Sequence, residues 1–428
     1  MVFWKLLLDF IAAAPKITVI LSERSESKNL HISGGAKILR LHFISLRMTR
    51  KGKQHIVFVS LEILFLKGGG SMQEFHCKTK ILSGANALDW LKDCSCKTLL
   101  VVTDPYFMKN GTAQAIAQRV QAEQREFFDG VKPDPSVELA AEGTALMRQY
   151  RPDLLIDLGG GSAMDTAKAM VYFAGEGIKF VAIPTTSGSG SEVTDFAILT
   201  HDGVKHPLVD RRMQPDIALI SAELVEKLPP SLVADGGFDV LSHALEALAA
   251  TNATPLTDAL ATGAFLTAFH LLPASFRGDV RVRGQIHLAS TMAGLAFTQS
   301  GLGLCHALSH SLGGIFHLPH GRLNAILLPE VVACNAETVG ERYASLAKQA
   351  GLGANSQTMG VRNLRNALIR LRKELHLPAT LQEAGIPPHK LRQHRQEIIA
   401  AALADPCMAT NPGKVNVGKV LDLVSGRG

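Results

Sequence analysis

Two pairs of residues with metal-binding side chains occur at helical spacing in the second half of the chain. Asp239 and His243 are four residues apart in FDVLSHALEAL, and His306 and His310 repeat this spacing in CHALSHSLGG. Side chains four residues apart leave the same face of a helix. The chain has 16 histidines, so one such pair could arise by chance. Two pairs in apolar helical segments indicate more, because a buried Asp or His needs a polar partner.

One carboxylate and three imidazoles form a donor set for a divalent ion such as Fe²⁺ or Zn²⁺, with a position open for substrate. His317 and His320 follow the second pair and add further imidazoles. A bound metal ion lowers the pKa of a ligated hydroxyl by roughly eight units. Hydride can then leave the carbon for a nicotinamide. The pattern therefore predicts a divalent-metal site that could activate a hydroxyl group, and hydride transfer would also need a dinucleotide site.

Glycine-rich turns follow two apolar runs in the first half of the chain. Leu154–Leu158 leads into Gly159-Gly160-Gly161-Ser162, and Phe180–Ile183 leads into PTTSGSG at 184–190. Glycines let backbone N–H groups surround a phosphate at a helix N-terminus. Neither turn has the G-x-G-x-x-G spacing, and one glycine turn is often only a tight turn. Two of them after successive strands favour dinucleotide binding.

Asp104 ends a third apolar run, Thr98–Thr103. A carboxylate there can accept hydrogen bonds from the ribose hydroxyls of an adenosine and would repel a 2′-phosphate, which favours NAD over NADP. The alternative is an N-cap for the helix that follows, and one side chain can do both.

Elements of two kinds must position these residues. Up to about residue 228, short β-rich runs alternate with helical stretches, which predicts a parallel sheet with ligands at the carboxyl ends of its strands. After Pro229-Pro230, Ala- and Leu-rich stretches with helical spacing take over, such as Leu256–Leu272 and Gln285–Ala296. We therefore expect an α/β domain at 72–228 and an all-α, metal-binding domain at 229–428.

Composition excludes several other classes of protein. The chain has 428 residues, 46% of them apolar, and a formal charge of +6. Residues 1–71 hold eleven basic and four acidic side chains, which leaves 33 basic and 34 acidic ones for 72–428. The neutral main body gives no sign of a nucleic-acid surface. Six scattered cysteines without a CxxC pair favour a reducing, cytoplasmic setting.

Residues 1–71 differ from the rest, with apolar runs at Phe3–Ala14 and Ile56–Leu66 between basic stretches. Neither run reaches the roughly 18 apolar residues that a membrane-spanning helix needs. We expect a native start at Met72, with the preceding segment arising from a start-site error or being disordered. A flexible or amphipathic targeting extension is the alternative.

From about Lys78 to Asn411 the chain resembles the iron-containing (group III) alcohol dehydrogenases. The matching segments are VVTD (101–104), PDPS (133–136), GGGSAMDTAKA (159–169), IPTTSGSGSEVT (183–194), GFDVLSHALEA (237–247), PLTDA (255–259) and GLGLCHALSHSLGGIFHLPHGRLNAILLP (301–329). Within the family, the chain most resembles propanol and ethanol dehydrogenases of bacterial microcompartments. The fold implied is a Rossmann-like domain followed by a helical one, the dehydroquinate synthase-like arrangement.

This resemblance also implies residue roles. Metal ligation falls to Asp239, His243, His306 and His320, the last two at the family's separation of fourteen residues. His310 becomes the candidate for a proton relay. NAD contacts are implied for Asp104, Asp134, Gly160, Gly161, Ser162, Asp165, Thr185, Thr186, Ser189, Thr194 and Lys205. Asp134 stands where the family often has Asn, and His317 stands where it often has a polar amide.

The function expected is interconversion of a small primary alcohol and its aldehyde with NAD(H) and Fe²⁺, with Zn²⁺ as the other metal that the ligands suit. We expect a homodimer or higher oligomer in the cytoplasm or a microcompartment, with no nucleic-acid or membrane partner. The alternatives are a glycerol or polyol dehydrogenase of the same superfamily and a non-catalytic NAD-binding scaffold. A phosphorylated substrate would need clustered basic residues, and only Arg322 lies near the ligand segments.

Overall fold

A computed structural model describes residues 17–21, 37–48, 54–65 and 73–426, except 176, 202 and 203. The chain divides into two compact units, residues 1–74 and 75–428. In the first, β1 (Ile17–Leu21), β2 (Lys37–Met48) and β3 (Gln54–Phe65) pair antiparallel in that order. The rest of the predicted extension, including Phe3–Ala14, lies outside the described residues. The start-site hypothesis stays a prediction.

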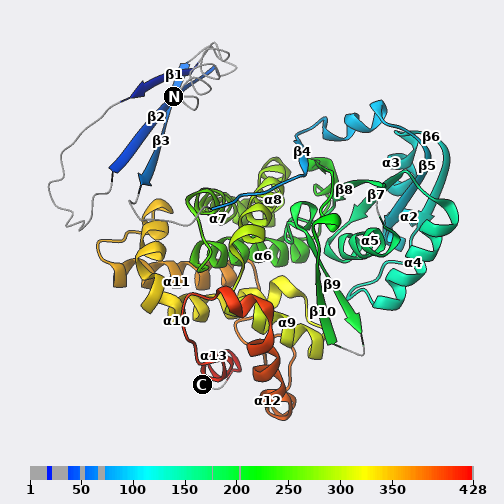
Figure 1. The fold of residues 1–428 in the computed structure, drawn as a ribbon. Coiled ribbons are helices and arrows are strands. Elements are labelled where there is room, and N and C mark those ends of the chain that lie inside the picture. The colour runs from blue at the N-terminus through cyan, green and yellow to red at the C-terminus, as the bar shows by residue number, and fades with distance from the viewer. Residues whose placement is uncertain are drawn as a thin grey trace. The chain divides into compact units, whose positions relative to one another are not determined.

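A six-stranded parallel sheet forms the first part of the larger unit (Figure 1). Its order is β4-β11-β8-β7-β5-β6, and the bounds are Lys80–Ser83, Ile217–Ile220, Lys179–Pro184, Leu154–Gly159, Ser95–Thr103 and Gln121–Phe128. The chain leaves β5 for β6 on one side and returns to β7 on the other. The strand order thus reverses between β5 and β7, where ligands of such sheets bind.

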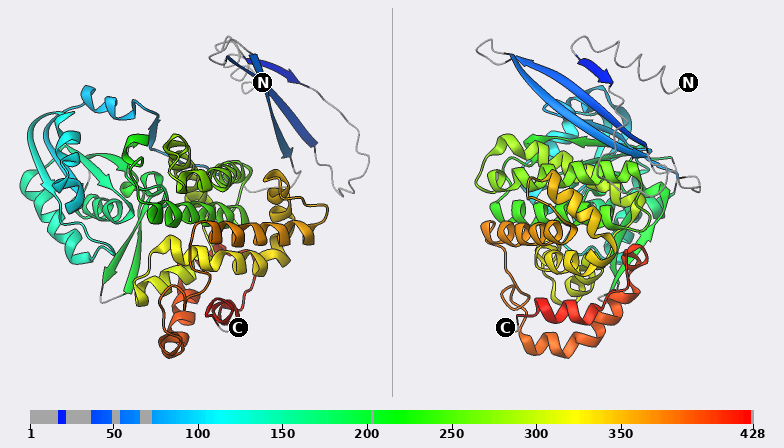
Figure 2. Two further views of the ribbon diagram at one scale, coloured as in Figure 1. Left: turned by 180° about the vertical axis from the view of Figure 1, so that it is seen from behind. Right: turned by 90° about the vertical axis from the view of Figure 1, so that its left-hand side faces the viewer.

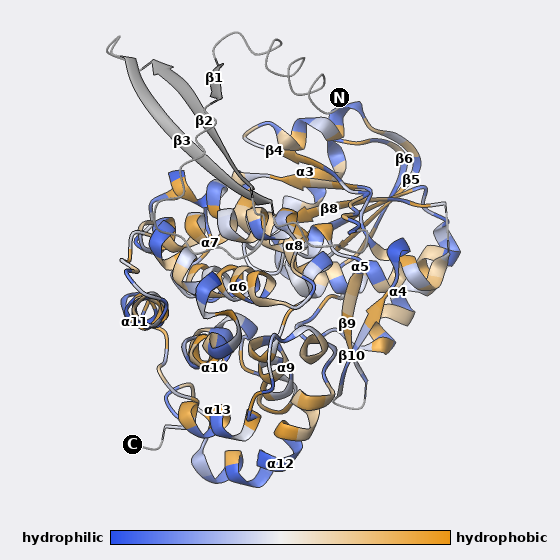
Figure 3. Cartoon of the chain, turned by 60° about the vertical axis from the view of Figure 1, so that its left-hand side comes forward, coloured by the Kyte–Doolittle hydropathy of each residue, from blue (hydrophilic) through white to orange (hydrophobic). Residues whose placement is uncertain are grey.

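Helices cover both faces of this sheet, which explains the continuous apolar runs of its strands. One face packs on η1 (Ala87–Asp93) and α3 (Thr112–Gln118). The other packs on α4 (Val137–Tyr150) and α5 (Gly161–Ala174). Strands β5 and β8 are accordingly coloured mostly hydrophobic in Figure 3. The predicted runs at 98–103, 154–158 and 180–183 are confirmed as β5, β7 and β8.

Several elements were not predicted from the sequence. The segment after Asp104 forms two short helices, α2 (Pro105–Lys109) and α3, because Gly111 between them has φ +82°. Strand β6 has a mostly polar sequence, QAEQREFF, because it lies at the sheet edge. An antiparallel hairpin, β9 (Phe196–His201) and β10 (Val204–Val209), follows the second glycine turn, after η2 (Ser191–Val193).

The part of the unit after residue 229 is helical in the described chain, as predicted, and lies beside the sheet (Figure 2). Its main helices are α6 (Pro230–Ala249), α7 (Pro255–Phe276), α8 (Arg283–Ser300), α9 (Leu304–Phe316), α10 (His320–Gln349), α11 (Gln357–Glu374), α12 (Pro388–Ala404) and α13 (Val417–Val424). They share one large apolar core. The fold class is confirmed. The boundary at 228 lies between β11 and α6 and stays a prediction.

Helix α7 is, among the described residues, long and apolar enough to cross a membrane by length and composition. One third of its most apolar window is buried, and it packs against α6 and α8. Core helices of globular proteins have the same character, so this is weak evidence for a membrane span.

A buried carboxyl group in the core of the sheet lowers the free energy of unfolding. Asp157 on β7 is fully buried, and neither of its carboxyl oxygens has a hydrogen-bond partner among the described residues. Burial raises the pKa of Asp157 well above its ordinary value, although the nearby Lys168 opposes the shift. Because the folded state holds this proton more tightly than the unfolded chain, the free energy of unfolding falls as pH rises above the ordinary carboxyl pKa.

We therefore expect Asp157→Val to stabilise the protein at pH 8 by about 1–3 kcal/mol, the usual desolvation cost of an unpaired buried polar group. The advantage should shrink towards pH 4, close to the ordinary pKa of an Asp carboxyl, and what remains there is the cost of burying the neutral, unpaired carboxyl group. Urea unfolding at both pH values measures this. Equal stabilisation at the two pH values would show that Asp157 does not titrate as inferred.

Candidate metal and dinucleotide site

Three helices and one loop bring the predicted metal ligands together. Asp239 and His243 lie one turn apart on α6, His306 lies in the first turn of α9, and His320 is the first residue of α10. The glycine loop after β8 lies against them, because His243 Nδ1 donates to the Gly188 carbonyl at 3.2 Å. A Cβ at Gly188 would lie 3.1 Å from Asp239 Oδ2 and from the Gly236 Cα, so the close approach favours glycine.

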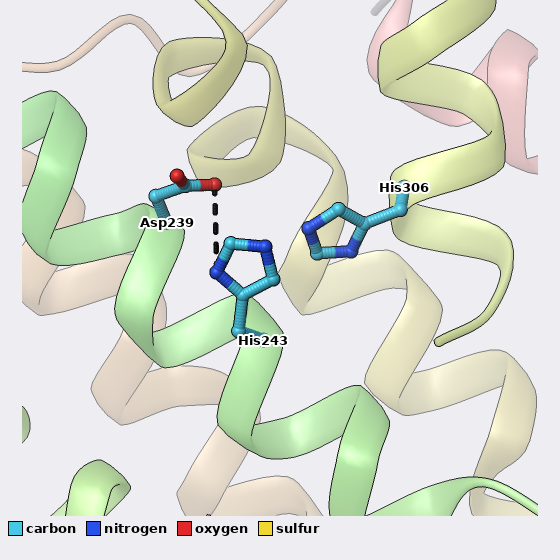
Figure 4. Close-up of side chains that lie close together, drawn as sticks. All are labelled: Asp239, His243 and His306. Atoms are coloured by element: carbon cyan, nitrogen blue, oxygen red, sulfur yellow. Dashed lines mark ion pairs between the residues drawn. The ribbon is translucent and has the colours of Figure 1, made fainter. Parts of the chain in front are cut away.

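The four side chains converge. One ligand atom from each of Asp239, His243 and His306 lies within 4.8 Å of the others, and all three residues are buried (Figure 4). His320 Nε2 lies 3.6 Å from Asp239 Oδ1, and its ring centroid lies 5.1 Å from that of His306. The rings of His243 and His306 stack with centroids 4.4 Å apart.

A buried imidazole nitrogen without a partner indicates that this donor set fits a cation. His306 Nδ1 donates to Glu246 Oε2 at 2.6 Å, which leaves the lone pair on Nε2. That Nε2 is buried and has no hydrogen-bond partner among the described residues. His243 uses Nδ1 on Gly188 in the same way. A buried nitrogen without a partner is costly unless an ion binds it.

The electrostatics agree with the same conclusion. Burial raises the pKa of Asp239 to about 7 and lowers the pKa of His243 to about 3. Burial, followed by the neighbouring imidazoles, lowers the pKa values of His306 and His320 well below the ordinary range. Neutral imidazoles are the form that binds metals, and a divalent cation would restore the charge of the buried carboxylate.

Glu246, which no sequence pattern identified, holds the His306 ring in place through its Nδ1. It is 2% exposed and lies one turn beyond His243 on α6. Besides the His306 ring, its carboxylate accepts from the backbone N–H groups of Gly303, Cys305 and His306. It therefore caps the start of α9 and fixes the His306 tautomer, as outer carboxylates do around metals. Its spacing of three from His243 was the available signal.

Two further side chains hold the ligands in place. Asn324 on α10 donates from Nδ2 to Asp239 Oδ1 at 2.8 Å and accepts from Ser309 at 2.5 Å. The ring of Phe297 on α8 stacks on His243 at 4.4 Å between centroids. Both residues restrict the orientation of a ligand, and neither has a free atom with which to bind the ion.

His310 lies beside the four ligands rather than among them. Its ring stacks on His320 with centroids 5.2 Å apart, and its Nδ1 lies 2.8 Å from Asp405 Oδ2. Asp405 precedes η6 (Pro406–Thr410), and its Oδ1 accepts from the backbone N–H of Cys407. Although burial opposes it, bonding to His310 lowers the pKa of Asp405 to about 2. Asp405, 95 residues away in sequence, gave no signal that would have identified it.

The two glycine turns meet at the carboxyl ends of β7 and β8. Gly160, the N-cap of α5, lies against Thr186, and Gly161 lies against Ser189. Ser162 follows in the first turn of α5. The structure thus brings these five predicted dinucleotide residues to one edge of the sheet, at the N-terminus of α5, where backbone N–H groups can receive a phosphate.

Two other predicted dinucleotide residues are buried, and one of them is already bonded within the protein. Thr185 is buried, and Thr194 is fully buried with its hydroxyl 2.6 Å from Lys168 Nζ. Burial raises the pKa of Asp165 to about 6, against the effect of Lys168. Thr194 therefore positions Lys168 in this structure, and its contact with a dinucleotide stays a prediction.

Asp104 has the N-cap role that was the alternative, since its Oδ1 accepts from the N–H groups of Tyr106 and Phe107. It also directly follows β5, beside the point where the strand order reverses, and its contact with a ribose stays a prediction. Asp134 pairs with Lys205 at 2.7 Å and with His317 at 3.5 Å. This cluster links the predicted cofactor residues to the end of α9.

Comparison with known proteins agrees with this geometry. Residues 78–222 match the family described as iron-containing alcohol dehydrogenase, and residues 233–427 match the C-terminal part of the same family. The chain belongs to the iron-containing alcohol dehydrogenase family. The predicted family, and with it the expectation of an enzyme, is confirmed.

Three similar proteins match this chain over 95% or more of their own length. A protein named NADPH-dependent butanol dehydrogenase from Clostridium saccharobutylicum is 38% identical, over 81% of this chain and 95% of its own. 1-Propanol dehydrogenase PduQ of Citrobacter freundii is 38% identical, over 82% and 99%. The structure of an iron-containing alcohol dehydrogenase from Thermococcus thioreducens has 31% identity and a TM-score of 0.75, over 82% and 98%.

Proposed function

We propose that the protein interconverts a small primary alcohol, such as propanol or ethanol, and its aldehyde, by hydride transfer with NAD(H). The observation that carries this is the convergence of one carboxylate and three imidazoles beside the glycine turns, with Asp239, His243 and His306 buried and His320 partly exposed. Relatives named for propanol and butanol, at 38% identity, support the substrate class.

We propose that Asp239, His243, His306 and His320 hold Fe²⁺, although the same set would also bind Zn²⁺. The bound ion supplies polarisation of the substrate oxygen, and the nicotinamide supplies or accepts hydride. The protein's part is to hold the ligands rigid, through Glu246 and Asn324.

His310 is the proposed proton relay. Asp405 accepts from the His310 Nδ1–H, so Nε2 is the atom at which the ring accepts or returns a proton. The ionised Asp405 stabilises the imidazolium that forms when Nε2 accepts that proton. Asp405 is therefore proposed as the residue that positions the relay.

The glycine turns are proposed to bind the dinucleotide phosphates, with Asp104 at the adenosine ribose. One relative is named for NADPH, so the cofactor preference needs its own test. Asp104→Ser keeps an N-cap for α2 but removes the charge. Without the charge, the site no longer repels the 2′-phosphate of NADPH. We therefore expect the ratio of kcat/KM for NADH to kcat/KM for NADPH to fall by about tenfold, which corresponds to about 1.4 kcal/mol of lost discrimination. An unchanged ratio would assign Asp104 to capping alone.

The proposal as a whole is tested with metal-depleted protein resupplied with Fe²⁺ or Zn²⁺. C2–C4 aldehydes and diols are assayed with NADH and NADPH. We expect the highest kcat/KM with Fe²⁺, NADH and a short unbranched aldehyde. A higher kcat/KM for glycerol or another polyol would favour the alternative polyol dehydrogenase, and no turnover with any substrate would favour the scaffold.

Cytoplasmic location, microcompartment association and assembly as a homodimer or higher oligomer also remain proposals. The likeness to 1-propanol dehydrogenase PduQ supports the microcompartment. Sedimentation of the purified protein tests the oligomeric state.

A further inference from the structure

Besides the ligand set already described, one other group of metal-binding side chains meets in the described part of the chain. It consists of His310 on α9 with Asp405 and Cys407 at the start of η6. One ligand atom from each lies within 4.8 Å of the other two, and all three residues are partly accessible. We propose that this group is a second, inhibitory site for a thiophilic divalent cation such as Zn²⁺.

The backbone preorganises the group. Asp405 Oδ1 accepts from the N–H of Cys407 at 2.8 Å, which directs Oδ2 to His310 Nδ1, also at 2.8 Å. Bonds from Zn²⁺ to nitrogen, oxygen and sulfur are about 2.0–2.3 Å, so two donors of a tetrahedral ion lie roughly 3.3–3.8 Å apart. The three donor atoms lie within 4.8 Å of one another and would reach that spacing by rotation of the side chains, with solvent at the fourth position.

Charge and donor type favour this cation. The Asp405 carboxylate and a Cys407 thiolate together neutralise one divalent ion, and His310 adds a neutral nitrogen. On binding, the Cys407 thiol releases its proton to solvent and forms a bond from sulfur to the ion. The Nδ1 proton of His310 is replaced by the ion, and the ring carries its proton on Nε2 instead. Sulfur selects Zn²⁺ or Co²⁺ over Mg²⁺ and Ca²⁺.

Inhibition follows from the place of His310, and this part rests on the proposed function. An ion on Nδ1 fixes the proton on Nε2, so the ring can no longer accept a proton there. The ion also separates His310 from Asp405. Excess Zn²⁺ should therefore slow the enzyme without displacing the metal held by Asp239 and the three histidines.

Cobalt titration of the full-length protein tests the site. A thiolate ligand gives Co²⁺ an intense charge-transfer band in the near ultraviolet, and the first site contains no sulfur. We expect two ions per chain in the wild type, by elemental analysis, with the band growing as the second binds. Cys407→Ser should bind one ion without the band, whereas Cys334→Ser, which removes a partly buried cysteine on α10, should behave as the wild type.

A single ion in the wild type, or a band that persists in Cys407→Ser, would overturn the site.

Inhibition is tested by adding Zn²⁺ to the iron-loaded enzyme. We expect Cys407→Ser to need at least about tenfold more Zn²⁺ than the wild type for half-inhibition, because even the loss of an outer partner of a metal ligand lowers affinity by about 10–100-fold. Displacement of iron would affect both proteins equally. If a second ion binds without slowing turnover, the site stands but its inhibitory role is wrong. If the enzyme turns over no substrate at all, the proposed function is wrong, and the cobalt titration still decides whether the site exists.

Discussion

Replacing His306 by alanine should abolish alcohol turnover. Among the four proposed ligands, His306 is the one whose Nε2 is buried without a hydrogen-bond partner in the described residues, and the substitution removes this ligand. A catalytic metal supplies several kcal/mol of transition-state stabilisation, and each 1.4 kcal/mol is a factor of ten. We therefore expect kcat/KM to fall by about 10³-fold or more, measured with saturating iron.

Binding of NADH should survive this change, because the glycine turns at Gly160–Ser162 and Thr186–Ser189 do not include His306. Fluorescence titration with NADH measures it. The matched control is His270→Ala, which removes an exposed histidine from α7 and should leave both turnover and metal content unchanged. Full activity of His306→Ala would contradict the metal site, and loss of NADH binding together with activity would indicate misfolding.

The sequence indicates two of the four proposed ligands directly, because their spacing within a helix is visible. Asp239 and His243 share a helix face, and in the structure His306 and His320 lie beside them. That the four residues bind a metal ion stays a prediction. Their proximity in space, however, depends on the packing of α6, α9 and α10, which no local spacing encodes. The sequence reached it through family resemblance.

The supporting residues show where such reasoning stops. Asp405 meets His310 across 95 positions of chain, after α12 returns the polypeptide to α9. Strand β6 was not predicted because it lies at the sheet edge, where its mostly polar sequence lacks the apolar run of a buried strand. The burial of Asp157 was not predicted either, because nothing in LLIDLG indicates that its carboxyl group is fully buried without a partner.

Glu246 gives the second large effect, on both metal affinity and stability. Its carboxylate satisfies three backbone N–H groups at the start of α9 and the His306 ring, all inside the core. Glu246→Ala strands these donors, each at a cost of about 1–3 kcal/mol, and we expect the free energy of unfolding to fall by at least about 3 kcal/mol. Urea unfolding of the metal-free protein measures this, because no bound ion then contributes.

Glu246→Gln keeps only part of these contacts. With the amide oxygen in the place of Oε1, it still accepts from the Cys305 N–H, but the amide nitrogen then faces the His306 ring and the Gly303 and His306 N–H groups and can accept from none of them. We therefore expect a smaller loss of stability than in Glu246→Ala, together with loss of the bond to the His306 ring. The ring loses the partner that fixes its tautomer, and iron affinity should fall by about 10–100-fold, measured by competition with a chelator. Excess iron should restore most of kcat. Glu192→Gln is the matched control, because Glu192 is equally buried but bonds Thr291 instead of a ligand, so iron affinity should not change. An unchanged affinity in Glu246→Gln would restrict Glu246 to capping α9.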